Sequence, residues 1–150
     1  MEGTRGAGGL SGPLASPGYW LHQAALAWKA ELDGRLRRLG LTHTQFILLA
    51  TVGWLETVGG GPPGQQEVAD GAGTDRQMTS RVVRTLADHG LIARLAHQSN
   101  ARSLRLTLTP QGRELARQAI VIAQDVDARF FGADPAGIRD SLRGIAEKRD

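Results

Sequence analysis

The sequence has no cysteine among its 150 residues. This absence excludes disulfide bonds, thiolate nucleophiles, thiol-based redox switches and cysteine-rich zinc sites. Four histidines remain as candidate metal ligands, but their spacings match neither HxxxH nor HExxH. We therefore expect no metal and no other cofactor.

Long hydrophobic runs are also missing. No apolar stretch approaches the roughly 18 residues that a membrane-spanning helix needs. The N-terminal segment lacks the apolar run of about 7 to 15 residues that a secretory signal contains. Because 41% of the residues are hydrophobic and 22% are charged, we expect a single soluble domain located in the cytoplasm.

The sequence also lacks the common signatures of catalysis. The GGGPPG segment at 59–64 is not followed by the GK[ST] of a phosphate-binding loop, so we interpret it as a connecting loop. No GxSxG elbow and no paired helical carboxylates near a histidine occur. We therefore expect that the protein is not an enzyme.

Positive charge, in contrast, is present and concentrated in one segment. The whole sequence has 18 Lys and Arg and 15 Asp and Glu, a formal charge of +3. Residues 74–113 contain seven arginines and two aspartates, which gives that segment +5 and leaves −2 for the rest of the chain. A basic segment in a slightly acidic protein is typical of a site that binds a polyanion.

The order of helix and strand signals predicts a mainly helical protein with one small hairpin. Residues 1–16 are rich in glycine and are expected to form a flexible tail. Capping residues and apolar side chains at steps of three and four predict six helices, at about 17–39, 42–57, 66–72, 74–89, 110–132 and from 135 onward. Capping pairs are expected at the start of the second helix (Thr42 with Gln45) and of the fourth (Thr74 with Gln77). Alternating leucines at 104–108 predict a strand that pairs with 92–96 through a turn at 97–101. This order predicts a winged helix-turn-helix lobe at 42–109 with long helices before and after it.

The fourth predicted helix carries residue types suited to reading DNA. We expect Met78, Val82 and Leu86 to face the core, because they recur at every fourth position. The opposite face then carries Gln77, Ser80, Arg81, Arg84 and Asp88. Arginine can bond guanine in the major groove, glutamine can bond adenine, and serine can bond base edges or phosphates. A solvated helix face would instead show mixed Glu and Lys pairs.

Three segments carry a family resemblance: GLTHTQFILLATV at 40–52, MTSRVVRTLADHGLIAR at 78–94 and ARSLRLTLTPQGREL at 101–115. In this order and at these separations they resemble the MarR-type bacterial transcription regulators. With the flanking helices, the resemblance covers nearly the whole chain after residue 17. It implies a ligand-responsive repressor that binds a pseudo-palindromic operator as a homodimer, with half-sites about 10 base pairs apart.

The resemblance also implies which segments and residues take part. Segments 17–41 and 110–150 would interlock with a second copy as the dimerisation region, and the lobe at 42–109 would bind DNA. The implied DNA contacts are Gln77, Thr79, Ser80, Arg81 and Arg84 on the fourth helix and Asn100, Arg102 and Arg105 on the hairpin. Asn100 stands where related wings commonly carry an acidic residue. Since Asn cannot form an ion pair with Arg102, that arginine is expected to be less fixed.

A small aromatic or anionic effector is a further implication, bound between the dimerisation region and the DNA-binding lobe. The candidate residues are Tyr19, Trp20, His22 and Trp28 on the first helix and Phe46 and Trp54 on the second. Ordinary core packing is the competing interpretation of these aromatic residues. The competing function is a winged-helix module that binds a protein and no specific DNA, whose affinity would not fall steeply with salt.

Overall fold

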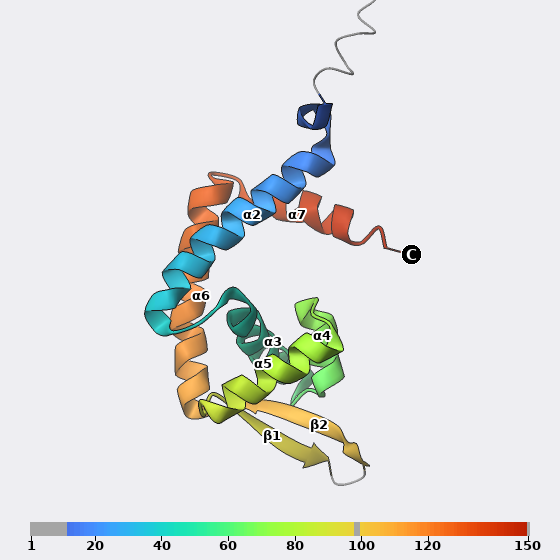
Figure 1. Cartoon of the computed structure of the whole chain (residues 1–150), viewed down its shortest axis with the longest axis vertical. Coiled ribbons are helices and arrows are strands. Elements are labelled where there is room, and N and C mark those ends of the chain that lie inside the picture. The colour runs from blue at the N-terminus through green and yellow to red at the C-terminus, as the bar shows by residue number, and fades with distance from the viewer. Residues whose placement is uncertain (1–11, 98–99, 150) are drawn as a thin grey trace, which may run out of the picture.

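The computed structural model describes residues 12–97 and 100–149, and it is mainly helical with one hairpin (Figure 1). The elements in chain order are η1 (Gly12–Ala15), α2 (Pro17–Leu36), η2 (Arg37–Leu39), α3 (His43–Gly59), α4 (Gln65–Ala72), α5 (Arg76–Asp88), β1 (Ile92–His97), β2 (Asn100–Leu108), α6 (Pro110–Phe131) and α7 (Pro135–Ala146). Residues 1–11 of the predicted tail at 1–16 lie outside the described residues. Gly12–Ala15, in its last part, form the short 3-10 turn η1.

Capping side chains begin several of these helices at the predicted places. Ser16 accepts a hydrogen bond from the backbone N–H of Tyr19 at the start of α2. The predicted capping box of α3 is confirmed, because Thr42 and Gln45 each accept from the other's backbone N–H. The hydroxyl of Thr109 accepts from the backbone N–H of Gly112 at the start of α6. These bonds satisfy N–H groups that would otherwise have no partner in the first turn of a helix.

The start of α5 differs from the prediction by one residue. Its cap is Asp75, whose Oδ1 accepts from the backbone N–H of Met78 at 2.7 Å, and not Thr74 paired with Gln77. The hydroxyl of Thr74 instead lies 2.7 Å from the hydroxyl of Thr79. The reason is that Asp is at least as strong an N-cap as Thr, so the helix begins one residue later than predicted.

The core is centred on α3. Fully buried side chains come from α2 (Leu32, Leu36), α3 (Leu48, Leu49, Val52), α4 (Val68), α5 (Val83, Leu86), β2 (Leu106) and α6 (Val126). Burial of each large apolar side chain contributes about 1.5 to 3 kcal/mol. Because α3 packs against α2, α4, α5, α6 and β2, it holds the helix pair and the winged lobe together.

Two lobes are visible along the molecule (Figure 1). The long helices α2 and α6 pack side by side, and α7 follows α6 at the end away from the hairpin. The second lobe contains α3, α4, α5 and the hairpin of β1 and β2. Within the described part of the chain, no helix is both long and apolar enough to cross a membrane.

The hairpin is attached to the lobe through both faces of β2. The strands are antiparallel, with Ile92 opposite Leu108, and the predicted apolar face is confirmed because Leu106 and Leu108 are buried. The other face is not simply solvated, since Thr107 donates a 2.7 Å hydrogen bond to Glu56 of α3. An isolated bridge also joins Arg105 to Gly64, just before α4.

A close backbone contact joins the start of the hairpin to α6. Gly112, in the first turn of α6, is buried against Leu91, which directly precedes β1. A Cβ atom added at Gly112 would lie only 1.9 Å from the carbonyl oxygen of Leu91. Glycine is therefore the residue that this contact requires.

We expect the Gly112→Ala substitution to lower the free energy of unfolding by about 1 to 3 kcal/mol or more, because the backbone must move to admit the methyl group. Gly34→Ala is the matched control, since Gly34 lies inside α2 with no atom within 4 Å of an added Cβ. That substitution should stabilise the protein by about 0.5 to 1 kcal/mol. Urea denaturation measures both changes. Equal stabilities of the two variants would contradict the contact.

Candidate nucleic-acid interface

The face of α5 that packs on the core is not the predicted one. Thr79, Val83 and Leu86 are buried, whereas Met78 and Val82 are only partly buried. The predicted stripe of Met78, Val82 and Leu86 is therefore rotated by about one residue. Because an α-helix has 3.6 residues per turn, its buried positions are spaced by four and then three residues, here at 79, 83 and 86, and do not follow a strict repeat of four.

Thr79 was predicted to contact DNA, and this prediction is wrong. Its side chain is only 1% exposed, and its hydroxyl donates a 2.7 Å hydrogen bond to the carbonyl of Asp75. Together with the contact to Thr74, this bond satisfies the buried hydroxyl. Thr79 thus fixes the first turn of α5 and has no surface to offer a base.

The outward face of α5 carries the other predicted residues. Gln77, Arg81 and Arg84 are exposed, and Ser80 is partly buried at the edge of that face. One guanidinium nitrogen of Arg81 lies 3.1 Å from the sulfur of Met78. Among the described residues, Arg81 and Arg84 form no ion pair. Their charge is therefore free to attract an anion.

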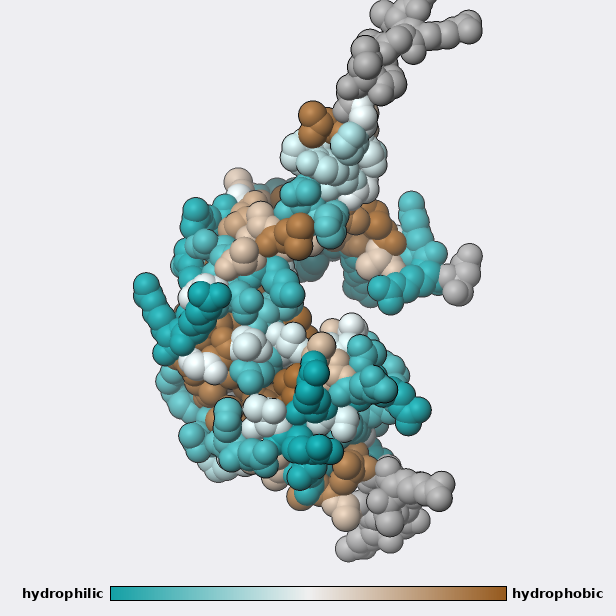
Figure 2. Space-filling model, viewed as in Figure 1, coloured by the Kyte–Doolittle hydropathy of each residue, from teal (hydrophilic) through white to brown (hydrophobic). Residues whose placement is uncertain are grey.

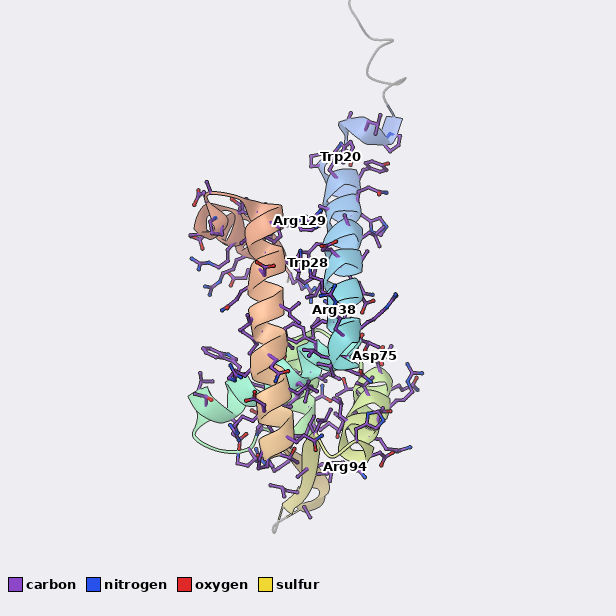
Figure 3. The ribbon with its side chains drawn as sticks, turned by 90° about the vertical axis from the view of Figure 1, so that its left-hand side faces the viewer. Trp20, Trp28, Arg38, Asp75, Arg94 and Arg129 are labelled. Atoms are coloured by element: carbon purple, nitrogen blue, oxygen red, sulfur yellow. The ribbon has the colours of Figure 1, made fainter. Side chains whose placement is uncertain are left out.

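A groove lies beside this face, between α4, α5 and β2. It has a volume of about 540 Å³, and its lining includes Gln66, Glu67, Arg76, Ser80 and Arg105. Two of these residues are arginines and one is a carboxylate. Asp75, labelled in Figure 3, marks the N-terminal end of α5, the end that contributes Arg76 and Ser80 to the groove.

Arg105 faces this groove but is already engaged. Its Nη1 lies 3.4 Å from Glu67 Oε1 and 3.4 Å from the carbonyl oxygen of Pro62. The family resemblance implies a DNA contact for Arg105 and no role for Glu67. A glutamate at the third position of a helix signals a cap, and Glu67 does accept from the N–H of Gly64. Nothing in the sequence alone pairs it with a strand residue 38 positions later.

The predicted contacts at the wing tip remain predictions. The backbone of β2 is described from Asn100, but the side chains of Asn100 and Arg102 lie outside the described part of the structure. Arg94, on β1, is exposed (Figure 3).

The predicted effector residues are spread over several places in the described part of the structure. Tyr19 and Trp20 contact each other edge to face at the start of α2, and His22 is exposed there. Phe46 is a core residue, 9% exposed, whereas Trp54 is 64% exposed on α3. Figure 3 shows Trp20 far along α2 from Trp28, which lies between α2 and α6. The competing interpretation, core packing, thus holds for Phe46.

Trp28 belongs to a small polar cluster at the junction of the two lobes. Its indole N–H donates a 2.8 Å hydrogen bond to Asp127 of α6, and its ring meets the His43 ring edge-on at 5.4 Å. The backbone N–H of His43 donates to Asp33 of α2 at 2.8 Å. The Nε2 atom of His43 is buried and has no hydrogen-bond partner among the described residues.

The surroundings of His43 favour its neutral form. Burial lowers the pKa of His43 below its usual 6.5, and the nearby charge of Lys29 lowers it further, against an opposing effect of Asp33. The position of His43 at the N-terminus of α3 acts in the same direction, because the helix dipole disfavours a cation there.

Comparisons with known sequences find one family. The MarR family profile matches residues 41–104. The HTH-type transcriptional regulator YdcH of Bacillus subtilis is 36% identical over 128 residues, which are 83% of this chain and 84% of the relative. The HTH-type transcriptional repressor Rv2887 of Mycobacterium tuberculosis is 32% identical over 133 residues, with coverage of 87% and 91%.

Solved structures share the architecture. Rv2887 in complex with salicylic acid has a TM-score of 0.63 at 32% identity and covers 89% of this chain and 96% of its own. A mutant MarR from Escherichia coli complexed with operator DNA has a TM-score of 0.76 at 19% identity, with coverage of 91% and 97%. The predicted fold, a winged helix-turn-helix with flanking long helices, is confirmed.

The lowered pKa of His43 predicts an acid-sensitive stability. Because the folded state disfavours protonation, the contribution of neutral His43 is fully present above about pH 6.5 and is lost as the pH falls below it. We expect the wild type to lose more unfolding free energy between about pH 7.5 and pH 5.5 than His43→Gln does. Urea denaturation at the two pH values measures this. Equal losses of unfolding free energy in the wild type and in His43→Gln would contradict a lowered pKa of His43 in the folded protein.

Proposed function

The chain belongs to the MarR family of HTH-type transcriptional regulators, and from this premise we propose that it represses transcription by binding a pseudo-palindromic operator as a homodimer. Membership confirms the resemblance seen in the sequence. It also confirms the expectation of a regulator rather than an enzyme, because the relatives are named as transcriptional regulators and repressors.

The outward face of α5 is the observation that carries the proposal. Gln77, Arg81 and Arg84 project from a helix whose opposite face is anchored in the core. An α-helix fits the major groove, and these side chains are the types that bond adenine and guanine edges there. Their segment, 74–113, also carries the excess positive charge of the chain.

The groove beside α5 supports a backbone contact. Arg76, Ser80 and Gln66 line it and can donate hydrogen bonds to phosphate oxygens. Such contacts would fix the position of α5 along the duplex, while the exposed residues of α5 select the sequence. On the hairpin, Arg102 is the proposed minor-groove contact.

Exposed apolar side chains support the homodimer. Most of them lie on the helices outside the winged lobe: Trp20, Leu21 and Leu26 on α2, Ile120, Val121 and Phe130 on α6, and Ile138, Leu142 and Ile145 on α7, whereas Trp54, Val58 and Leu95 are exposed within the lobe. Figure 2 shows apolar side chains over α2 and α7, above the hollow that separates these helices from the winged lobe. Large exposed apolar surface of this kind is typical of an interface. A twofold dimer would place two α5 helices on two half-sites.

A small aromatic acid is the proposed effector. This proposal is supported by the relative Rv2887, which is 32% identical and has been crystallised with salicylic acid. Trp28 and His43 lie where α2, α3 and α6 meet, so a ligand bound near them can change the angle between the lobes. Tyr19, Trp20, His22 and Trp54 would then line the site together with the second protomer.

Binding to duplex DNA from the region upstream of its own gene tests the main proposal. A sequence-specific regulator binds that DNA in the presence of unrelated competitor, and its affinity falls steeply with salt as counterions are released. A footprint with two half-sites about 10 base pairs apart would support the dimer. If neither this DNA nor sequences selected from random duplexes are preferred, the winged-helix protein-interaction module becomes the better interpretation.

Substitution of the exposed arginines of α5 should weaken operator binding. We expect Arg81→Ala and Arg84→Ala each to cost about 1 to 3 kcal/mol, with relaxed base preference at the contacted position. Arg117→Ala is the control, because Arg117 is an exposed arginine of α6 that pairs with Glu114. Affinities are measured by fluorescence anisotropy at fixed salt. An affinity unchanged by both α5 substitutions would refute the placement of α5 in the groove.

The effector proposal predicts a fluorescence response. We expect sodium salicylate at millimolar concentration to change the tryptophan emission and to release the operator, with Trp28 as the main reporter. The Trp28→Phe variant should lose most of the change and Trp20→Phe a smaller part of it, since Trp20 lies at the far end of α2 from Trp28. Absence of any response in the wild type up to millimolar salicylate would count against an effector of this class.

A further inference from the structure

The central part of the hairpin is held to the lobe by hydrogen bonds to one short segment. The backbone N–H of Leu106 donates to the carbonyl of Pro63 at 2.9 Å, and Gly64 forms a bridge with Arg105. The segment at 62–64 therefore acts as a short third strand along the edge of β2. It leads directly into α4, so the hairpin and α4 are connected through it.

One carboxylate oxygen joins the three parts of this connection. Glu67 Oε1 accepts from the N–H of Gly64 at 3.2 Å and lies 3.4 Å from Nη1 of Arg105. The same Nη1 lies 3.4 Å from the carbonyl oxygen of Pro62. Glu67 thus contacts the edge segment, caps α4 and holds a side chain of β2.

The negative charge of Glu67 opposes DNA binding, so its presence in the groove calls for another role of this residue. Glu67 lines the same groove as Arg76 and Ser80, the proposed phosphate contacts. A carboxylate there repels phosphates, and its side chain is 62% exposed. Its pairing with Arg105 also removes one arginine from the charges that can meet DNA.

We propose that Glu67 is a positioning residue for DNA binding, which acts through Arg105 to fix the wing against the helix-turn-helix. The inference rests on the proposed function, because the wing must be placed relative to α5 for both to reach one duplex. Since Arg105 and Glu67 are 36% and 62% exposed, the pair adds little to overall stability. Its effect is on the orientation of β2, whose far end carries Arg102.

The substitution Glu67→Gln separates positioning from charge. Glutamine keeps the oxygen that accepts from Gly64, so the cap of α4 is retained while the ion pair is lost. If Glu67 acted only through its charge, its removal would strengthen binding to DNA. If Glu67 positions the wing, loss of its ion pair with Arg105 weakens DNA binding by roughly two- to fivefold, the range expected for an exposed ion pair.

Glu114→Gln is the matched control. Glu114 is an exposed glutamate of α6 that pairs with an arginine, Arg117, at 2.6 Å, so the variant loses the same charge and the same kind of pair away from the wing. We expect this control to bind the operator as tightly as the wild type or slightly more tightly. The inference is overturned if Glu67→Gln binds as tightly as Glu114→Gln.

A double-mutant cycle with Arg105→Gln tests whether the two residues act together. We expect the double variant to bind about as weakly as either single variant, because both substitutions break one contact. The dependence of affinity on salt should be unchanged in Arg105→Gln. The inference is overturned if the losses of binding free energy in the two single variants add up in the double variant and Arg105→Gln reduces the salt slope by about one. That result would show that Arg105 contacts a phosphate directly.

The same measurements separate this inference from the proposed function. They use the full chain and the operator that the wild type prefers over competitor DNA. If the wild type prefers no DNA, the proposed function fails and the inference fails with it. If the wild type binds specifically but the Glu67 and Arg105 variants behave as independent surface charges, the inference alone fails.

Discussion

The burial of α3 is the constraint on which the rest of the structure depends. This helix packs against α2, α4, α5, α6 and β2, and its side chains Leu48, Leu49 and Val52 are fully buried. Because one helix belongs to the cores of both lobes, the angle between the helix pair and the winged lobe is set by side-chain packing. Close packing resists small displacements, so a ligand or proton at this junction acts on both lobes at once.

The junction between the lobes also contains polar groups. Trp28 bonds Asp127, and His43 at the first turn of α3 has a buried nitrogen without a partner among the described residues. An unsatisfied buried polar atom costs stability, so it marks a place where the packing is not optimised for rigidity alone. This is where an effector of the proposed class would have most influence on the distance between two α5 helices.

The polar face of β2 shows how the wing is held. Glu56 of α3 accepts from Thr107, and Glu67 of α4 holds Arg105, two residues further along the same face. Two carboxylates thus attach the strand to two different helices, while Leu106 and Leu108 pack on the core from the opposite face. The hairpin is therefore anchored on both faces, which an isolated two-stranded ribbon needs in order to be stable.

The sequence by itself determined the order of the helices, their bounds to within about three residues, the inward face of β2 and the location of the basic segment. These features depend on neighbouring residues: caps such as Thr42 with Gln45, the breaks at glycines such as Gly90, and the alternation of leucines in β2. Only the tertiary structure decided that Thr79 is buried and that Arg105 is paired with Glu67. The physical reason is that helical periodicity leaves the buried face uncertain by about one residue, and the partner of a charge is chosen by elements that are distant in sequence.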